Sequence, residues 1–378
     1  MQTAAALTPV LDAARKAAAE VDATGRFPQE AVDALRSSGL LGLTLPDDAG
    51  GMGGTPEDLV EVMSQLAAAC GSTAMIYLMH VSSAMVVAAA PPSGQPDLLR
   101  RMASGEVLGT LAFSERGSRS HFWAPVSQAS LANGGVRLTA PKSWVTSAGH
   151  ADVYVVSTLS AAQLVDEVTP TTSDLYAVPA DRSGVAVTGA FKGLGLRGNA
   201  STPMTFDLDV SDGDRLGGPG EGFRLKLEAV LPWFNLGNAS VSVGLSQAAV
   251  DAAVTHASGA RLQHLDESLA QLPTIRAQLS RMSLDVAATR DYVLATARSL
   301  AAPDDGTTLR VLGVKALAND AALRITDAAM RVCGGAAFSD HLQLERFFRD
   351  ARAGHVMAPT ADVLYDFYGK AITGLPLF

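Results

Sequence analysis

The chain has 378 residues, of which 48% are hydrophobic and 18% charged, so its composition excludes an intrinsically disordered protein. Acidic residues outnumber basic residues by 38 to 29, which argues against a protein that coats nucleic acid through clustered Lys and Arg. A chain of this length predicts two or three packed units rather than one core.

Three further classes of protein are disfavoured by particular residues. Cys70 and Cys333 are too few for a disulfide framework or a cysteine-based zinc site. The longest apolar run, Ala84–Ala90, falls short of the roughly 20 residues that span a bilayer. The N-terminal residues Met1–Ala4 show no basic segment of a secretory signal. We therefore expect a soluble, cytoplasmic protein with no membrane or nucleic-acid partner.

The first hundred residues are rich in Ala and Leu at helical spacing. Apolar residues recur three and four positions apart, as on one face of an amphipathic helix. The glycine-rich stretch Asp47–Gly54 interrupts this pattern, and no regular element would tolerate it. The pattern predicts four helices, over Leu7–Val21, Gln29–Ser38, Pro56–Ala69 and Ser72–Ala88.

The apolar period changes to two in the middle of the chain. Short runs bounded by Gly, Pro, Asn and Asp alternate as β-strands do, and their spacing predicts a closed or sandwiched antiparallel sheet. The expected strands are Val107–Phe113, Val126–Leu131, Val136–Ala140, Val153–Thr158, Leu175–Pro179, Val185–Thr188 and Met204–Val210.

The helical period returns at Gly222 and holds to the end. It predicts helices over Phe223–Ala257, Leu269–Leu300, Thr307–Val332 and Ala361–Ile372, with a face of low charge that a further helix or another subunit covers. We therefore predict an α+β multi-domain fold. It has an N-terminal helical domain (residues 1–105), a middle antiparallel β-barrel or sandwich (106–217) and a C-terminal four-helix bundle (218–378).

Familiar catalytic motifs are absent from the sequence. The seven histidines show no pairing at metal-ligand spacing, so no metal site is expected. Gly193–Gly198 matches the letters of a dinucleotide-binding loop, but a strand pattern rather than a helix follows it. This segment is better interpreted as a tight turn.

Three segments carry residues that could serve redox chemistry. They are Leu111–His121, Lys142–Asp152 and the pair Cys333–Phe338 and Leu344–Arg352. A planar redox ring needs an aromatic wall, hydroxyl and backbone donors, and glycines that let phosphates approach, and these segments offer such parts. Taken alone, Trp144 would be interpreted as a core aromatic residue.

Together these segments resemble the acyl-CoA dehydrogenase family over nearly the whole chain. The resemblance depends on the order and spacing of several motifs. They are the loop Gly50–Gly54, Ser114-Glu115, Lys142-x-Trp144-x-Thr146, Gly195–Gly198 followed by Ser201-Thr202, Gly334-Gly335, and Glu345-Arg346-x-x-Arg349-Asp350.

The resemblance implies a helical domain, a β-barrel and a four-helix bundle that bind FAD, usually as a homotetramer. Phe113 and Ser114 would face the flavin, Trp144 would stack beside it, and Thr146 would lie near its N5 edge. Ser120 would lie near the substrate entrance. The implied cofactor-binding residues are Phe113, Ser114, Ser120, Trp144, Thr146, Arg261, Gly334, Gly335 and Thr360.

The sequence departs from the family where the catalytic base belongs. The family's usual glutamate corresponds to Ala358, and the alternative position on an earlier helix corresponds to Phe234, followed by Asn235 where the family has an arginine. Alanine cannot remove a proton, a step worth roughly 10²–10⁴-fold in rate. By sequence neighbourhood alone, the candidates for a surrogate base are His80, His121, His355 and Asp362.

Three functions remain open. The first is α,β-dehydrogenation of an acyl thioester, on CoA or a carrier protein, with a displaced base. The second is a monooxygenase that uses O₂ and an exchangeable reduced FMN or FAD on a small organic or aromatic substrate; His355, Pro359 and the run Gly369–Gly374 resemble such relatives. The third is an inactive partner subunit of a hetero-oligomer. The resemblance further implies a homo-oligomer, either tetramer or dimer, for an active enzyme.

Overall fold

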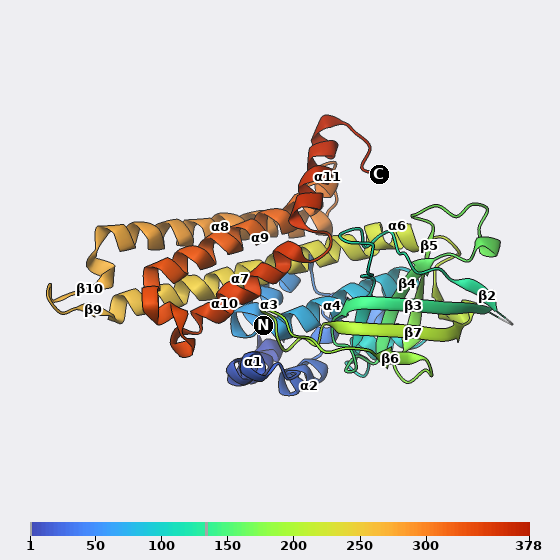
Figure 1. Cartoon of the computed structure of the whole chain (residues 1–378), viewed down its shortest axis with the longest axis horizontal. Helices are drawn as coiled ribbons and strands as arrows, with labels where there is room; N and C mark the ends of the chain where they lie inside the picture. The colour runs from blue at the N-terminus through green and yellow to red at the C-terminus, as the bar shows by residue number, and fades with distance from the viewer. Residues whose placement is uncertain (1, 133–134) are drawn as a thin grey trace. The chain divides into compact units, whose positions relative to one another are not determined.

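The computed structural model describes residues 2–132 and 135–378 (Figure 1). Its main helices and strands are α1 (Gln2–Thr24), α2 (Gln29–Ser38), α3 (Pro56–Ala69), α4 (Gly71–Ala89), α5 (Leu98–Ala103), β1 (Gly109–Ala112), β2 (Ser130–Ala132), β3 (Gly135–Val145), β4 (Val153–Leu159), β5 (Ser173–Pro179), β6 (Val185–Val187), β7 (Thr202–Val210), β8 (Arg215–Leu216), α6 (Gly222–Leu225), α7 (Leu231–Gly259), β9 (Arg261–Leu262), β10 (Glu267–Ser268), α8 (Pro273–Ala301), α9 (Thr307–Cys333), α10 (Leu344–Val356) and α11 (Ala361–Thr373).

The chain divides into two compact units. The first comprises the residues up to Leu59 together with 75–192 and 197–234, and the second comprises 60–74, 193–196 and 235–378. The predicted fold class, with N-terminal helices, middle β-sheets and C-terminal helices, is confirmed.

Helix α4 is long and apolar enough to cross a membrane by length and composition alone, which the shorter run Ala84–Ala90 did not indicate. However, 83% of its most apolar window is buried inside the protein. It therefore has the burial of a core helix. Polar residues within it are buried too, and Ser82 and Ser83 bond their hydroxyls to backbone carbonyls of the same helix.

The β-strands of the first unit form two four-stranded sheets, in the orders β1-β4-β5-β8 and β2-β3-β7-β6. Side chains from both sheets, among them Leu138, Tyr154, Tyr176 and Phe206, share one buried core, so the predicted sandwich is confirmed. The expectation that all strands are antiparallel was wrong, because β1 pairs with β4 in parallel. The chain passes through the other sheet between these two strands and does not return through a hairpin.

The second unit is built around long helices that lie side by side, α7 to α10 (Figure 1). Apolar residues of α7, α8 and α9, such as Leu236, Val293 and Val314, share a core with Val60. Helix α10 was not predicted, because its many charges were interpreted as a motif rather than as one face of a helix. It supplies a further helix on α9, as the low charge of that surface indicated.

A π-helical segment, Lys226–Val230, interrupts the long helix predicted over Phe223–Ala257. Such a segment adds one residue to a helical turn and is often found at functional sites. It also changes which face of the following helix each residue occupies. Phe234 lies beyond the π-segment, within α7.

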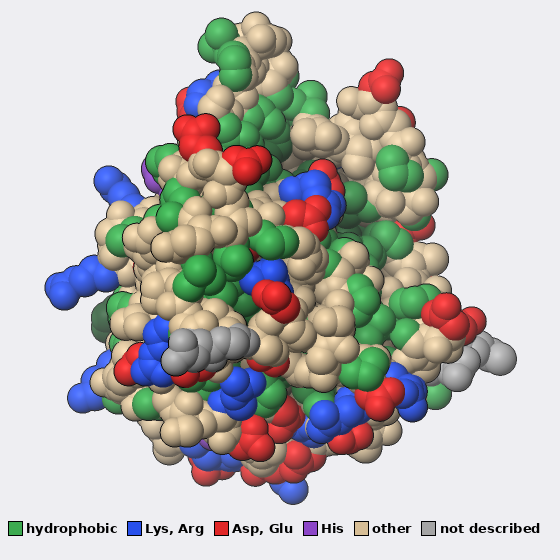
Figure 2. Space-filling view, turned by 90° about the vertical axis from the view of Figure 1, so that its right-hand side faces the viewer, with side chains coloured by type: hydrophobic (Ala, Val, Ile, Leu, Met, Phe, Trp, Pro, Cys, Tyr) green, Lys and Arg blue, Asp and Glu red, His purple; other side chains and the backbone are tan. Residues whose placement is uncertain are grey.

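On the face drawn in Figure 2, Lys and Arg side chains lie close to Asp and Glu side chains. Among the described residues many charges are paired, such as Arg224 with Glu221 and Glu228. Despite the net charge of −9, this face is therefore not one continuous acidic surface.

Candidate active site

Trp144 lies at an irregularity of β3, where the register with β7 shifts between Lys142 and Val145. Its backbone has φ +51°, which is strained for an aromatic residue. Its side chain is 65% exposed. The interpretation of Trp144 as a core aromatic residue was therefore wrong, and the bulge instead leaves a flat apolar ring open to a ligand.

Hydroxyl groups cluster beside Trp144. Thr146 Oγ1 lies 2.9 Å from Ser201 Oγ, so these two hydroxyls bond each other. Ser147 Oγ and Thr202 Oγ1 are buried and have no hydrogen-bond partner among the residues that the structure describes. Buried polar atoms are nearly always paired, so these two hydroxyls fit a ligand with ring nitrogens or oxygens. An exposed indole next to unpaired hydroxyls suits a planar heteroaromatic ring such as a flavin.

The strand end that carries Phe113 and Ser114 lies next to this segment, because Ser143 N donates to Ser114 O at 2.8 Å. The Phe113 ring is buried, is stacked on Phe122 with centroids 6.4 Å apart, and has Lys226 Nζ 5.7 Å from its centroid. The expectation that Phe113 and Ser114 face a flavin stays a prediction. Ser120, also a predicted site residue, is buried.

Glu115 and Lys142, from two separate sequence motifs, form a buried ion pair. Glu115 also accepts the backbone N–H groups of Val126 and Ser127. Burial alone would raise the pKa of Glu115, but Lys142 and these N–H groups hold it below its usual range. The pair therefore holds the strand of Trp144 to the segment after Ser114, a role that the sequence analysis did not predict.

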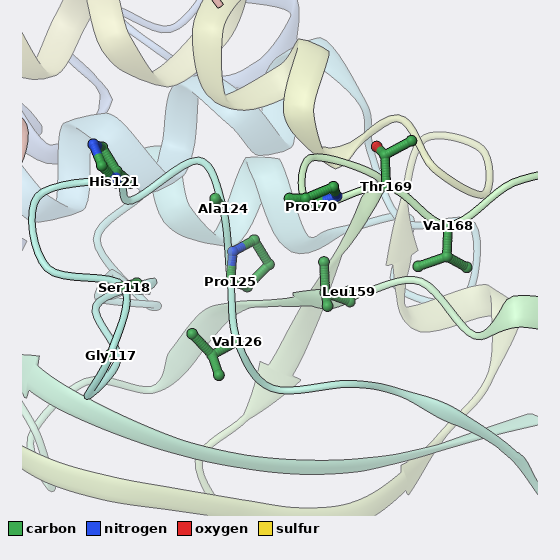
Figure 3. Close-up of a pocket in the computed structure, with 10 residues that line it drawn as sticks. All are labelled: Gly117, Ser118, His121, Ala124, Pro125, Val126, Leu159, Val168, Thr169 and Pro170. Atoms are coloured by element: carbon green, nitrogen blue, oxygen red, sulfur yellow. The ribbon is translucent and has the colours of Figure 1, made fainter.

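An open pocket of about 450 Å³ lies in the first unit, where the segment Gly117–Val126 faces the segment Val168–Pro170 (Figure 3). Its lining is mainly apolar, and His121, exposed and beside Trp123, is its titratable group. Lys226 Nζ connects the two walls, because it donates to Trp123 O at 3.2 Å and to Ser173 Oγ at 3.1 Å.

The two positions where a catalytic glutamate was expected are apolar and lie in ordinary packing. Phe234 is buried, and the neighbouring Asn235 donates its amide to Val311 O at 2.9 Å inside the second unit. Ala358 lies in the turn between α10 and α11, and Thr360 is the residue before the first turn of α11. Neither position can accept a proton.

His355, at the end of α10, lies beside an acidic residue of α9. Its Nδ1 is 3.2 Å from Asp320 Oδ1, and both side chains are 33% exposed. The two atoms form no hydrogen bond, since His355 Nδ1 has none within the described chain. Tyr365 OH donates to Asp320 Oδ2 at 2.6 Å, and burial together with this bond raises the pKa of Tyr365 to about 12. Asp362, exposed in the first turn of α11, acts electrostatically on the same tyrosine.

His80 is a structural residue and not a base. It is fully buried, its Nε2 lies 3.1 Å from Leu41 O, and its Nδ1 accepts Gly109 N–H at 3.1 Å. Both ring nitrogens are therefore occupied, and burial lowers the pKa of His80 to about 4. Its role is to hold the start of β1, which leads to Phe113 and Ser114.

The chain matches sequence models of three consecutive domains of one family. The acyl-CoA dehydrogenase N-terminal domain matches residues 7–106, the middle domain residues 110–208 and the C-terminal domain residues 220–373. The chain belongs to the acyl-CoA dehydrogenase family. It is thus an enzyme of the flavin oxidoreductase class.

Individual acyl-CoA dehydrogenase relatives agree with this membership. A probable acyl-CoA dehydrogenase of Mycobacterium leprae is 26% identical over 92% of this chain and 88% of its own length. The structure of butyryl-CoA dehydrogenase from Megasphaera elsdenii has a TM-score of 0.91 and 21% identity, with 98% of each chain covered. A prolyl acyl carrier protein oxidase has a TM-score of 0.87 and 17% identity, again with 98% of each chain covered.

Two motifs of the acyl-CoA dehydrogenase resemblance contact each other in the second unit. Leu196 N donates to Asp350 Oδ1 at 2.6 Å, and Arg349 donates to Leu194 O at 3.1 Å. An added Cβ on Gly195 would lie 2.6 Å from Arg349 backbone atoms, so only glycine fits there. The contacts between these two motifs are part of the fold, which agrees with the interpretation of Gly193–Gly198 as a turn.

The remaining predicted cofactor residues lie at the surface of the second unit. Arg261 pairs with Asp266 within the β9–β10 hairpin, and the pair is largely exposed. An added Cβ on Gly334 or Gly335 would meet no described atom within 4 Å, so the backbone there is open to a ligand. Their contact with a cofactor stays a prediction.

Proposed function

We propose that this flavin oxidoreductase binds FAD and converts the Cα–Cβ bond of an acyl thioester into a double bond, with His355 as the base. The observation that carries the proposal is the pair of His355 with Asp320, three residues before the alanine that replaces the usual glutamate. His355 is partly exposed and has a carboxylate beside it, whereas His80 is closed in the core.

The proposed FAD site uses the groups around the β3 bulge. The Trp144 indole would cover one side of the ring, and Ser147 and Thr202 would bond its polar atoms with their unpaired hydroxyls. FAD, when bound, supplies the two-electron acceptor that desaturation requires. The buried pair of Glu115 with Lys142 keeps this strand in position.

The proposed acid–base step belongs to three residues of the second unit. Asp320 beside Nδ1 favours the tautomer with its proton on Nδ1, which leaves Nε2 free to take the α proton. His355 Nε2 would take the α proton as the Cα–Cβ double bond forms, and the bound FAD would supply the acceptor for the hydride from Cβ. The nearby carboxylate stabilises the resulting imidazolium, and the Tyr365 hydroxyl fixes that carboxylate.

The test is anaerobic reduction of the bound flavin, followed by its visible absorbance. Purified protein should carry FAD, and acyl-CoA or acyl-carrier-protein substrates of graded length should bleach it. The carrier-protein arm is included because a protein of the same fold is named a prolyl acyl carrier protein oxidase. His355→Gln should slow reduction by about 10²–10⁴-fold while flavin content stays unchanged.

A matched control comes from α11. Asp366 is exposed and pairs with Lys370 on the same helix, so Asp366→Asn should reduce the flavin at the wild-type rate. A wild-type rate in His355→Gln would contradict the proposal. A loss confined to Asp362→Asn would assign the base to Asp362 instead.

The monooxygenase function is the second candidate, because apolar side chains occupy both glutamate positions, Phe234 and Ala358. A hydroxylation by reduced flavin and O₂ has no need of a carboxylate there. It requires O₂ consumption with a flavin reductase present and an oxygenated product. If thioesters leave the flavin oxidised and such a product forms, this second function replaces the first.

We further propose that the enzyme is a cytoplasmic homo-oligomer. The support is a group of exposed apolar residues on α11 and the segment that follows it, Ile372, Leu375 and Phe378. Light scattering of the purified protein should give a mass several times 39.0 kDa. A monomeric mass would contradict this.

A further inference from the structure

Lys315 on α9 is a fully buried lysine whose partners are all backbone carbonyls. Its Nζ donates to Gly354 O at 2.8 Å, to Met357 O at 3.1 Å and to Pro359 O at 2.8 Å. These carbonyls belong to the last turn of α10 and to the α10–α11 turn. The last carbonyls of a helix lack partners within the helix, and a cation there is favourable.

The three N–H bonds of an ammonium group match these three carbonyls, so the interaction is complete without a carboxylate. Burial lowers the pKa of Lys315 to about 7, which shows that the charge is held at a cost in desolvation. Removing this lysine alone would leave three carbonyls at the end of α10 and in the α10–α11 turn without their donor, and the cost would fall on the turn itself. The lysine therefore fixes the geometry of the turn.

The other side of the turn is also closely packed. A Cβ added to Gly354 would lie 2.6 Å from Asn319 Oδ1 and 3.1 Å from Asn238 Oδ1, both buried in the second unit. Gly354 thus has no room for a side chain next to Asn319 and Asn238, while its carbonyl accepts from Lys315. His355 follows directly in the chain.

We propose that Lys315 is a positioning residue that fixes the α10–α11 turn and, through the Gly354 carbonyl, the backbone that carries His355. Only the catalytic consequence of this proposal rests on the function proposed above. Lys315 does not touch substrate; it determines where His355 and Ala358 lie. Loss of its three hydrogen bonds releases the turn and leaves the helices on either side packed.

The test uses amide hydrogen exchange of the whole purified chain, in wild type and in Lys315→Met. Met357 N–H donates to Ala353 O at 3.0 Å and reports on the end of α10. We expect exchange of this amide and its neighbours to rise at least tenfold, with exchange in α8 unchanged. Unchanged exchange in the turn would overturn the proposal, and so would a parallel rise in every helix.

The catalytic consequence is measured on the same variant. With a thioester that reduces the wild-type flavin, Lys315→Met should lower kcat at least tenfold with little change in KM, and a wild-type kcat would overturn the proposal. Failure of the wild type itself to be reduced counts against the proposed function, and exchange in the turn still decides the role of Lys315.

Two further variants keep the test decisive. Gly354→Ala pushes on the same turn with Lys315 intact and should produce the same rise in exchange, even if Lys315→Met does not fold. Ser246→Ala is the control, because its hydroxyl bonds only Ser242 O within α7 among the described residues, so exchange and kcat should match wild type.

Discussion

The fold should lose stability between about pH 7 and about pH 5, because His80 binds a proton in the unfolded chain and not in the folded one. In the folded protein Nε2 must donate to Leu41 O and Nδ1 must accept Gly109 N–H, an arrangement that only the neutral ring can make. A proton on Nδ1 would break the bond to β1 and would place a charge in the core. Burial accordingly lowers the pKa of His80 to about 4, against 6.5 for the unperturbed side chain.

The size of the effect follows from these two pKa values. The folded state binds fewer protons than the unfolded state between them, so the stability is fully present above about pH 6.5 and is lost as pH falls toward 4. At about pH 5 the unfolded histidine is largely protonated and the folded one is not. The linkage relation then gives a loss of about 2 kcal/mol relative to pH 7.

The assay measures the free energy of unfolding at about pH 5 and at pH 7, for wild type and for His80→Gln. The variant has no group to titrate at this position. Other titrating groups act on both proteins, so the difference between the two pH responses isolates His80. The variant will be less stable at pH 7, because it loses well-formed buried bonds, but its stability should fall less on acidification. Equal losses in both proteins would refute the reasoning.

Three further outcomes are expected. Glu115→Gln should lower the free energy of unfolding by about 3–5 kcal/mol, since it leaves the buried charge of Lys142 without its carboxylate. In wild type the stabilisation from this pair is present above pH 4.5 and is lost as pH falls through the lowered pKa of Glu115. Trp144→Ala should lower FAD affinity about tenfold with little change in thermal midpoint, because the indole is exposed; unchanged affinity would remove Trp144 from the site. Gly244→Ala should destabilise by about 1–3 kcal/mol, since its Cβ would lie 2.1 Å from a carbonyl of α3, whereas Gly369→Ala has open space and should be harmless.

The sequence predicts the helices and most strands well, because each depends on apolar periodicity within a short window. The helix over Thr307–Val332 and the strands over Val153–Thr158 and Met204–Val210 lie within one or two residues of the observed elements. The parallel pairing of β1 with β4 could not be predicted in this way. It depends on where the intervening strands pair, which is a long-range property.

Two aromatic residues show why the site was harder to predict than the fold. Trp144 and Phe113 are both apolar residues in β-like runs, and nothing local distinguishes them. The shift of register against β7 turns Trp144 outward, whereas Phe122 and Lys226 enclose Phe113. The pairing of Glu115 with Lys142 is likewise invisible in either motif alone. Each outcome depends on a neighbour distant in the chain.

The costly features of the structure argue against an inactive partner subunit. A chain that no longer served a reaction could relax the left-handed backbone of Trp144 and could pair or replace the unpaired hydroxyls of Ser147 and Thr202, each at a gain or no loss in stability. Both features are present, and both lie at the proposed ring site. A working site gives a reason to keep strain and unpaired hydroxyls there, and a purely structural subunit gives none.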